Sequence, residues 1–241
     1  MNTIKIDSKN TLMIAHRGVS ALETENTAPA FVACGNRSYY GAECDIRSTK
    51  DGEFILCHDK TFLRTSGVDV APGDLTLDEL RQLVLFDIGG VNKRTDIRPT
   101  TLAEYVSICK KYGKKCIIEL KECFTEQQVL SYIDVIKKQE YLDSCIFIAF
   151  DYENLEVIRK FLPDQPVQFL TDDLPDELFE RMVKDRFDLD IYYRSLTKEL
   201  LDRCHASGIK VNCWTVDNPE DAERLCDWGV DFITSNILEG K

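Results

Sequence analysis

The chain has 241 residues, of which 44% are apolar and 30% are charged, a composition that can build a packed core and is unlike that of a disordered chain. Its 42 acidic and 30 basic residues give a net charge of −12, which argues against a nucleic-acid partner, since such partners require clustered Lys and Arg. The longest apolar run, Cys145–Phe150, is far shorter than the ~18 residues of a membrane-spanning helix, so no transmembrane segment is expected.

Short apolar runs alternate with helix-like segments along the chain, and each run is predicted to form a strand. The predicted strands are Leu12–Ala15, Ala42–Ile46, Phe54–Cys57, Cys116–Leu120, Cys145–Phe150, Val167–Leu170, Leu189–Tyr192, Ile209–Trp214 and Asp231–Thr234. Strands that alternate with helices indicate a parallel sheet.

Start and stop signals mark the helices between these strands. Thr76, Thr101 and Thr125 are each followed three residues later by Glu or Gln, which predicts capping boxes. Asn218 and Pro219 predict an N-cap followed by proline in the first helical turn. Three glycines are placed to end helices: Gly113, Gly208 and Gly229.

One strand does not belong to the parallel set. Asp51-Gly52 is typical of a two-residue hairpin loop, which makes Phe54–Cys57 antiparallel to the strand before it. The remaining eight strands predict a closed α/β barrel, with a doubly wound open sheet as the alternative. The whole chain, residues 1–241, is expected to be a single domain, with an insertion at about residues 60–98 that carries one short helix.

The hairpin brings charged residues to one strand face. With Asp51-Gly52 as the loop, Asp45 lies opposite His58, and cross-strand partners have Cβ atoms about 5 Å apart. Glu43 lies two residues before Asp45 and projects from the same face. A solvated strand face is the simpler explanation of Glu43 and Asp45 alone. Two carboxylates at the end of one strand also suit a hard cation bound by oxygens.

Other strand ends add to this cluster. Glu119 and Lys121 share one face at the end of the next parallel strand, and His16 and Arg17 follow the first strand. The carboxyl ends of barrel strands form the active face, and charges buried there without partners are costly. Arg matches a phosphate with two parallel hydrogen bonds. The group is typical of a site that binds an anionic phosphoester through a divalent cation.

The chain has so few histidines that each can be considered for a role in turn. The chain contains only His16, His58 and His205. His16 and His58 flank the carboxylates and form a candidate acid–base pair, although each also fits a hydrogen-bonded residue at a strand end. His205 lies on a polar helix, and we interpret it as structural.

The ten cysteines amount to about 4% of the chain, below the level of a disulfide scaffold. None forms a Cys-x-x-Cys pair, and Cys57, Cys116, Cys145 and Cys213 stand inside apolar runs. The N-terminus has no apolar stretch of signal-peptide length. We therefore expect buried, reduced thiols in a cytoplasmic protein, with a zinc site or a disulfide framework as alternatives.

Over nearly its whole length the chain resembles the glycerophosphodiester phosphodiesterases. The matching segments, in order, are Ala15-His16-Arg17-Gly18, Glu25-Asn26-Thr27-Ala28, Glu43-Cys44-Asp45, Thr49-Lys50-Asp51-Gly52, His58-Asp59, Arg64-Thr65-Ser66-Gly67, Leu75-Thr76-Leu77-Asp78-Glu79-Leu80, Pro99-Thr100-Thr101-Leu102-Ala103-Glu104, Ile118-Glu119-Leu120-Lys121, Val211-Asn212-Cys213-Trp214-Thr215-Val216 and Gly229-Val230-Asp231-Phe232-Ile233-Thr234. Each segment alone is weak, and the match rests on their number and order.

The resemblance implies a TIM (β/α)8 barrel with a small insertion after the second barrel strand. It implies metal-dependent hydrolysis of a small-molecule glycerophosphodiester to sn-glycerol 3-phosphate and an alcohol, through a cyclic phosphate. The implied roles are one divalent cation, Mg²⁺ or Ca²⁺, on Glu43, Asp45 and Glu119; acid–base catalysis by His16 and His58; phosphate binding by Arg17 and Lys121; and glycerol packing by Trp214, with Phe150 at the pocket wall. By spacing alone, Trp214 is more often a core residue.

The chain departs from the family pattern in three segments: Thr24 stands in place of Pro, Ala149 in place of Ser, and Thr234-Ser235-Asn236-Ile237 in place of Thr-Asp-Asn-Pro. None falls on a predicted metal or histidine position. Two other functions remain open. One is a phospholipase-D-like activity on lysolipids, against which the net charge argues mildly. The other is a barrel that binds phosphoesters without catalysis, for which loss of a ligand or a histidine would have been the sign.

Overall fold

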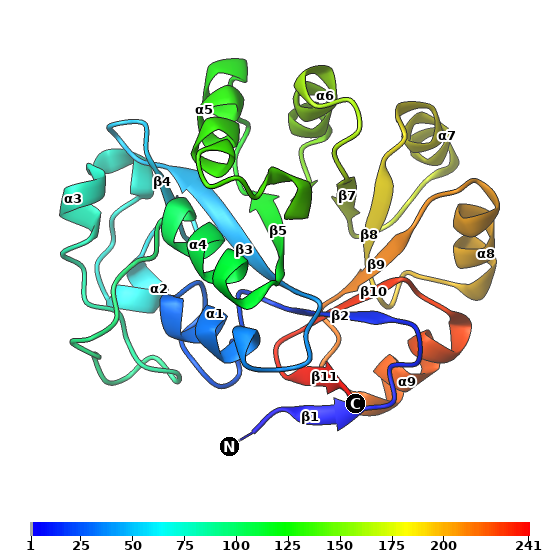
Figure 1. Ribbon diagram of the computed structural model, residues 1–241, viewed down its shortest axis with the longest axis horizontal. Coiled ribbons are helices and arrows are strands. Elements are labelled where there is room, and N and C mark those ends of the chain that lie inside the picture. The colour runs from blue at the N-terminus through cyan, green and yellow to red at the C-terminus, as the bar shows by residue number, and fades with distance from the viewer. Residues whose placement is uncertain (1) are drawn as a thin grey trace.

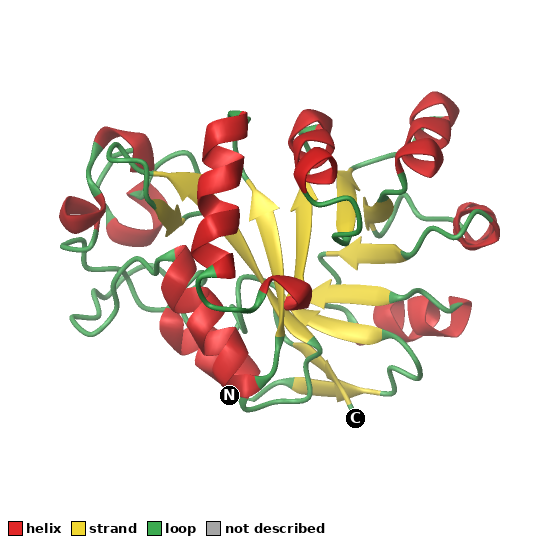
Figure 2. Ribbon diagram, turned by 45° about the horizontal axis from the view of Figure 1, so that its top comes forward, coloured by secondary structure: helices red, strands yellow, loops and turns green. Residues whose placement is uncertain are grey.

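The computed structural model describes residues 2–241, and within them eight parallel strands close into a ring with helices outside (Figures 1 and 2). The ring is closed because β2 pairs with β10 on one side and with β3 on the other. In chain order the ring strands are β2 (Leu12–Ala15), β3 (Gly41–Ser48), β5 (Lys115–Leu120), β6 (Cys145–Ala149), β7 (Val167–Thr171), β8 (Asp188–Tyr192), β9 (Val211–Trp214) and β10 (Phe232–Ser235). The predicted barrel is confirmed, and the open sheet is wrong.

Helices cover the outside of the ring, one after most strands (Figure 1). They are α1 (Ala28–Gly35), α4 (Leu102–Tyr112), α5 (Glu126–Lys137), α6 (Tyr152–Phe161), α7 (Asp176–Asp185), α8 (Lys198–Ala206) and α9 (Pro219–Trp228), and a short 3₁₀ helix, η2 (Leu142–Ser144), precedes β6. Thr101 and Thr125 form the predicted capping boxes, and Asn218 caps α9 ahead of Pro219. These caps satisfy backbone N–H groups that the first helical turn leaves unpaired.

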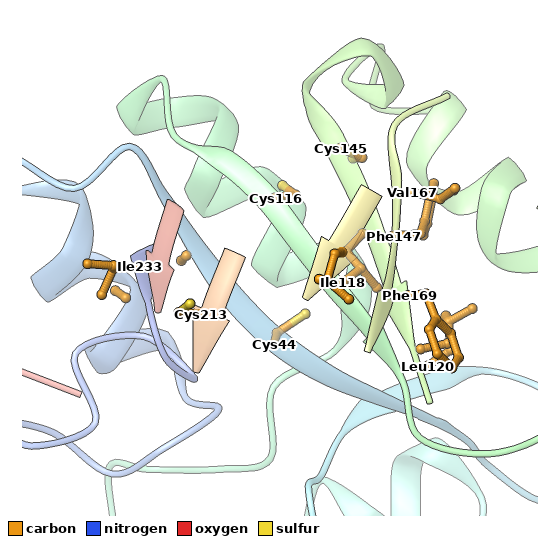
Figure 3. Close-up of a cluster of buried hydrophobic side chains, with 14 of the residues drawn as sticks. Cys44, Cys116, Ile118, Leu120, Cys145, Phe147, Val167, Phe169, Cys213 and Ile233 are labelled. Atoms are coloured by element: carbon orange, nitrogen blue, oxygen red, sulfur yellow. The ribbon is translucent and has the colours of Figure 1, made fainter. Parts of the chain in front are cut away.

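Side chains of the barrel strands alternate between the helix layer and the barrel interior. The outward-facing side chains Cys44, Ile118 and Phe147 are fully buried and belong to the large apolar cluster between sheet and helices (Figure 3). A smaller apolar cluster on the inward face of the barrel strands includes Ile14, Ile117, Ile146, Ile148, Leu170 and Phe232. Polar residues at the carboxyl ends of the strands line a cleft together with Ile148 and Leu170 of this cluster.

The antiparallel strand β4 (Phe54–Leu56) pairs with β3 as predicted, but the predicted register is wrong by one residue. Ile46 pairs with Leu56, and Thr49 N–H donates to Glu53 at 2.9 Å, so the loop has three residues, 50–52. Gly52 takes the left-handed conformation with φ of 81°, as three-residue hairpin loops require at that position. Asp45 therefore lies opposite the residue before His58, and His58 follows the end of the strand.

The segment between β4 and α4 contains three helical turns where one was predicted: α2 (Leu63–Ser66), the 3₁₀ helix η1 (Pro72–Asp74) and α3 (Leu77–Leu80). Thr76 forms the predicted capping box of α3. The segment lies beside β4 at the rim of the barrel (Figure 1). It packs through an apolar cluster of its own, made of Ile55, Cys57, Phe62, Leu80, Leu85 and Ile97.

Two short strands were not predicted. β1 (Ile4–Ile6) and β11 (Leu238–Gly240) pair in parallel and bring the two ends of the chain side by side (Figure 1). Each has three residues with a charged residue at its centre, so neither forms an apolar run that sequence patterning could detect.

All ten cysteines are free thiols, and every one except Cys123 is buried, as expected. Among residues 2–241, the structure contains no helix that is both long and apolar enough to cross a membrane.

Candidate active site

Three carboxylates meet at the carboxyl ends of neighbouring strands β3 and β5. Asp45 is paired with Glu119 across the two strands, and Glu43 projects from the same face of β3. All three side chains are buried, and each offers an oxygen such that the three atoms lie within 4.8 Å of one another.

These carboxylates are only partly satisfied within the chain. Glu43 Oε2 accepts a hydrogen bond from the backbone N–H of Arg17 at 2.8 Å, and Asp45 Oδ2 accepts one from Asn26 Nδ2 at 2.7 Å. The second oxygens, Glu43 Oε1 and Asp45 Oδ1, are buried and have no hydrogen-bond partner. Orphaned buried acceptors are costly and rare in proteins, so this pair of atoms points to a ligand.

The pKa values of the carboxylates reflect this crowding. Burial and the neighbouring Asp45 raise the pKa of both Glu43 and Glu119 above the ordinary range. Burial also acts to raise the pKa of Asp45, but the charges of Arg17 and Lys121 outweigh it and lower that pKa. A bound cation would hold all three ionised, and an all-oxygen ligand set with free oxygens suits a hard cation such as Mg²⁺ or Ca²⁺.

The two residues that donate hydrogen bonds to these carboxylates, Arg17 and Asn26, have unusual backbone conformations. Arg17 has φ of 53° and Asn26 has φ of 55°, in the left-handed region that side chains other than glycine seldom adopt. Gly18 follows at φ of 78°, and a Cβ there would come within 2.7 Å of the Ala30 backbone. The turn after β2 is therefore tight enough to direct the Arg17 N–H at Glu43.

His16 follows the last residue of β2, and its two ring nitrogens lie in different surroundings. Nδ1 lies 2.7 Å from Asn236 Oδ1, and Nε2 lies 4.0 Å from Glu43 Oε2 on the cleft side. Burial and the charge of Arg17 lower the pKa of His16 to about 4. The imidazole is therefore neutral at neutral pH and can accept a proton.

His58 lies beyond the end of β4, more exposed than His16. Its Nδ1 contacts Asp59 Oδ1 at 2.8 Å, and burial lowers its pKa, although the charge of Asp45 opposes this shift. A chain of ion pairs links the two histidine loops: Asp59 to Arg64 at 2.7 Å, Arg64 to Glu25 at 2.6 Å and Glu25 to Arg17 at 3.0 Å.

Lys121 follows β5 and contacts two carboxylates of the cluster. Its Nζ lies 2.7 Å from Glu119 and 3.6 Å from Asp45. Arg17 Nε lies 3.4 Å from Asp45 and makes no hydrogen bond. Positive charge from two loops thus surrounds the carboxylates and leaves donor capacity for an anion.

A cleft of about 420 Å³ opens above these residues. Among the side chains that line it are eight of the nine predicted site residues, namely His16, Arg17, Glu43, His58, Glu119, Lys121, Phe150 and Trp214. The ninth, Asp45, is fully buried beside the cleft. The rings of Phe150 and Trp214 meet edge to face at 5.7 Å and form an aromatic wall.

Sequence reasoning missed several residues of the site. Glu25, Asn26 and Arg64 stood inside matched motifs, but no spacing rule assigned them a role. Asp190 is fully buried in β8 and lines the cleft, with Oδ1 unpartnered, and burial together with the charge of Glu119 raises its pKa well above the ordinary range. The signal was present, because Asp190 interrupts an apolar strand.

The family comparison agrees with this geometry. A model of the glycerophosphoryl diester phosphodiesterase family matches residues 16–239. The chain belongs to this family and is an enzyme. A glycerophosphodiester phosphodiesterase of Caldanaerobacter subterraneus subsp. tengcongensis is 30% identical over 232 residues, which cover 95% of each chain.

Solved structures show the same fold. A phosphodiesterase of Oleispira antarctica, in complex with the product sn-glycerol-3-phosphate, matches with a TM-score of 0.86 and 24% identity over 95% of this chain and 94% of that chain. A glycerophosphodiester phosphodiesterase of Parabacteroides distasonis matches with a TM-score of 0.78 and 26% identity over 94% and 93%. The TIM-barrel prediction is confirmed.

Proposed function

We propose that the chain hydrolyses small-molecule glycerophosphodiesters to sn-glycerol 3-phosphate and an alcohol. The observation that carries this proposal is the cleft beside which three buried carboxylates, two of them with an orphaned oxygen, lie between two histidines. Family membership supports the substrate class, and the cationic side chains of Arg17 and Lys121 suit its phosphate.

Glu43, Asp45 and Glu119 would hold one divalent cation, Mg²⁺ or Ca²⁺. The unpartnered oxygens of Glu43 and Asp45, together with the nearby carboxylate of Glu119, support this assignment. When bound, such a cation polarises a phosphoryl oxygen and lowers the pKa of a coordinated hydroxyl. Arg17 and Lys121 would bind the remaining phosphate oxygens, since both side chains line the cleft.

Trp214 and Phe150 would position the glycerol moiety. Their rings form one wall of the cleft, and the indole N–H of Trp214 is buried without a partner. A ring face together with a free N–H suits an alcohol-bearing carbon chain, because the ring covers the carbons while the N–H donates to a hydroxyl.

The two histidines would transfer protons in two steps. His16 Nε2 takes the proton of the glycerol hydroxyl next to the phosphoester, the hydroxyl oxygen attacks phosphorus, and His58 gives a proton to the departing alcohol. The product of this step is a cyclic phosphate. In the second step a water loses its proton to His58 and opens the ring, and His16 returns its proton to the glycerol oxygen. The first attack is intramolecular and gains from proximity.

A diester whose glycerol lacks the neighbouring hydroxyl tests this mechanism. It should inhibit competitively, because the phosphate contacts remain, but it should not be hydrolysed. Hydrolysis at the normal rate would show that water attacks directly. Glycerophosphocholine is the matched control substrate, and its turnover checks that the enzyme is active.

A second activity on lysolipids has one observation in its favour. Leu63, Ile88 and Val91 are exposed apolar residues on the segment between β4 and α4, and Phe150 is exposed at the cleft wall. An acyl chain could cover these side chains. Choline release from lysophosphatidylcholine, reduced by Val91→Asp while glycerophosphocholine turnover stays normal, would establish this activity. Absence of release would exclude it.

We also propose a cytoplasmic location. The ten free thiols, nine of them buried, support a reducing compartment, since disulfides persist in oxidising ones.

A further inference from the structure

Two residues in neighbouring loops, neither of which lines the cleft, form a hydrogen-bonded chain that ends at His16. Asn236 follows β10 and places Oδ1 2.7 Å from His16 Nδ1. Asp217 lies between β9 and α9, and its Oδ2 accepts from Asn236 Nδ2 at 2.6 Å. The contacts form a line from an exposed carboxylate, through an amide, to the imidazole.

The direction of each hydrogen bond in this line is determined by Asp217. An ionised carboxylate can only accept, so the amide of Asn236 must turn its NH₂ group toward Asp217 and its carbonyl oxygen toward His16. Asp217 is itself fixed, because its Oδ1 accepts from the Asn236 backbone N–H at 2.8 Å and from Ser235 Oγ at 2.9 Å.

The tautomer of His16 follows from that orientation. The amide oxygen of Asn236 is an acceptor and also receives the hydroxyl of Ser20 at 2.5 Å. His16 Nδ1 can approach this oxygen at hydrogen-bond distance only as a donor, so a neutral imidazole has its proton on Nδ1 and a bare Nε2. Nε2 is the nitrogen that faces the cleft and Glu43.

We propose that Asp217, acting through Asn236, fixes His16 in the tautomer whose Nε2 lone pair faces the cleft, and that this pair of positioning residues makes His16 a proton acceptor. The catalytic part of this proposal rests on the proposed function, whereas the tautomer does not. In the opposite tautomer Nε2 would carry a hydrogen, and the imidazole could not take the proton of a substrate hydroxyl.

The tautomer can be measured without any substrate. With three histidines in the chain, a long-range ¹H–¹⁵N spectrum of the labelled protein contains three imidazole patterns, and the pattern lost in His16→Gln belongs to His16. We expect that pattern to show a protonated Nδ1 and a bare Nε2. A protonated Nε2 with a bare Nδ1 in the wild-type protein would overturn the proposal.

Asp217→Asn provides the perturbation. The oxygen of the new amide should stay where it accepts the Asn236 backbone N–H, so its NH₂ takes the place of Oδ2 and faces the NH₂ of Asn236. Asn236 is then expected to flip, and His16 to move its proton to Nε2. We expect kcat for glycerophosphocholine to fall by about 10²-fold, within the range for loss of one general base, while KM stays unchanged.

Asp221→Asn is the matched control. Like Asp217→Asn, it replaces a carboxylate by an amide and removes one negative charge, but Asp221 lies in α9 and its carboxylate contacts Arg224 rather than Asn236. We expect a normal tautomer and a normal kcat. Asn236→Leu is the second variant, used with a thermal-unfolding check in case Asp217→Asn is unstable. It removes the acceptor, and we expect a mixture of His16 tautomers and a reduced kcat.

The outcomes separate this inference from the proposed function. If the tautomer and kcat of a folded Asp217→Asn or Asn236→Leu variant both match the wild type, the positioning role is wrong. If the tautomer changes while kcat does not, His16 is not the proton acceptor. If the wild-type protein hydrolyses no glycerophosphodiester, the proposed function fails, and the tautomer spectra still decide what Asp217 does to His16.

Discussion

The two faces of the barrel strands differ in what they do, although their side chains alternate along the same strands. On β3, Cys44 faces the helices inside the large apolar cluster, while its neighbours Glu43 and Asp45 face the barrel interior. On β5, Ile118 faces outward and Glu119 faces inward. One strand therefore supplies both the core that folds the protein and the charges that bind a ligand.

The difference shows where folding energy is gained and where it is given up. Each apolar side chain buried in the outer layer stabilises the fold by about 1.5–3 kcal/mol. The inner face instead buries four carboxylates, those of Glu43, Asp45, Glu119 and Asp190, and all but Glu119 have an unpaired oxygen. Burying unpaired charge costs free energy. Substitutions on the two faces should consequently separate stability from activity.

The largest expected effect on the inner face is at the histidines. His16→Ala and His58→Ala should each lower kcat by about 10²–10⁴-fold, the usual range for loss of one acid–base group, with little change in melting temperature. His205→Ala is the control, since His205 pairs with Asp231 on the outside of the barrel and should leave kcat unchanged. Steady-state kinetics would contradict this expectation if all three variants behaved alike.

The outer face should respond in the opposite way. Phe147→Ala removes a fully buried ring that packs on Tyr132 at 5.8 Å and should cost about 3–5 kcal/mol of unfolding free energy. We expect kcat per folded molecule to stay near the wild-type value. Urea denaturation measures the first quantity and active-site titration the second. A normal unfolding free energy with a large loss of kcat would remove the distinction between the two faces.

Stability should depend on pH through the inner carboxylates. Burial raises the pKa of Glu119 and Glu43 in the folded chain, so without a cation these groups bind protons that the unfolded chain releases. Their stabilising contribution is present below the ordinary carboxylate pKa and is lost as pH rises through the raised values. A saturating divalent cation should offset that loss, by up to about 2.7 kcal/mol at 100 times its Kd.

The measurement is the melting temperature with cation and with chelator, between about pH 5 and pH 8. We expect the difference between the melting temperatures with cation and with chelator to increase with pH in the wild type and to stay small in Glu119→Gln. The lowered pKa of His16 changes stability with pH in the opposite direction, and it does so in both proteins. Subtracting the result for Glu119→Gln from that for the wild type therefore removes the contribution of His16. An equal difference at every pH, in both proteins, would contradict the proposed site.

The smallest expected effect is at Arg17. Arg17→Lys keeps the charge and loses the planar fork, so we expect a loss of about 1.5 kcal/mol in transition-state binding, close to tenfold in kcat/KM. The melting temperature should change little. A large fall in thermal stability with normal turnover per folded molecule would instead show that Arg17 serves folding through Glu25 and Asp45.

Local sequence signals were enough to predict the barrel strands and most helix caps. The capping boxes at Thr101 and Thr125 form as predicted because each depends only on residues three apart. The hairpin register was wrong because Asp51-Gly52 is compatible with both a two-residue loop and the observed three-residue loop, and a sequence does not distinguish them. His58 still reaches the cleft, because the chain leaves β4 after Leu56.

The site was predictable where its residues lie on strands or follow them in segments that match the family. The periodicity of a strand placed Glu43, Asp45 and Glu119 on one face. Asn236 and Asp217, by contrast, lie in loops after different strands, and only the folded ring brings them to His16. Asn236 lies between Ser235 and Ile237, two residues at which the chain departs from the family pattern, and those departures did not indicate a contact with the histidine.

The most direct test of the metal assignment is calorimetric titration of Mg²⁺ or Ca²⁺ into the chelator-treated, dialysed protein. If the orphaned oxygens of Glu43 and Asp45 belong to a cation site shared with Glu119, the wild type should bind one cation per chain. Glu119→Gln should bind far more weakly while remaining folded. The absence of saturable binding of either cation to the wild type, or unchanged binding in Glu119→Gln, would contradict the assignment.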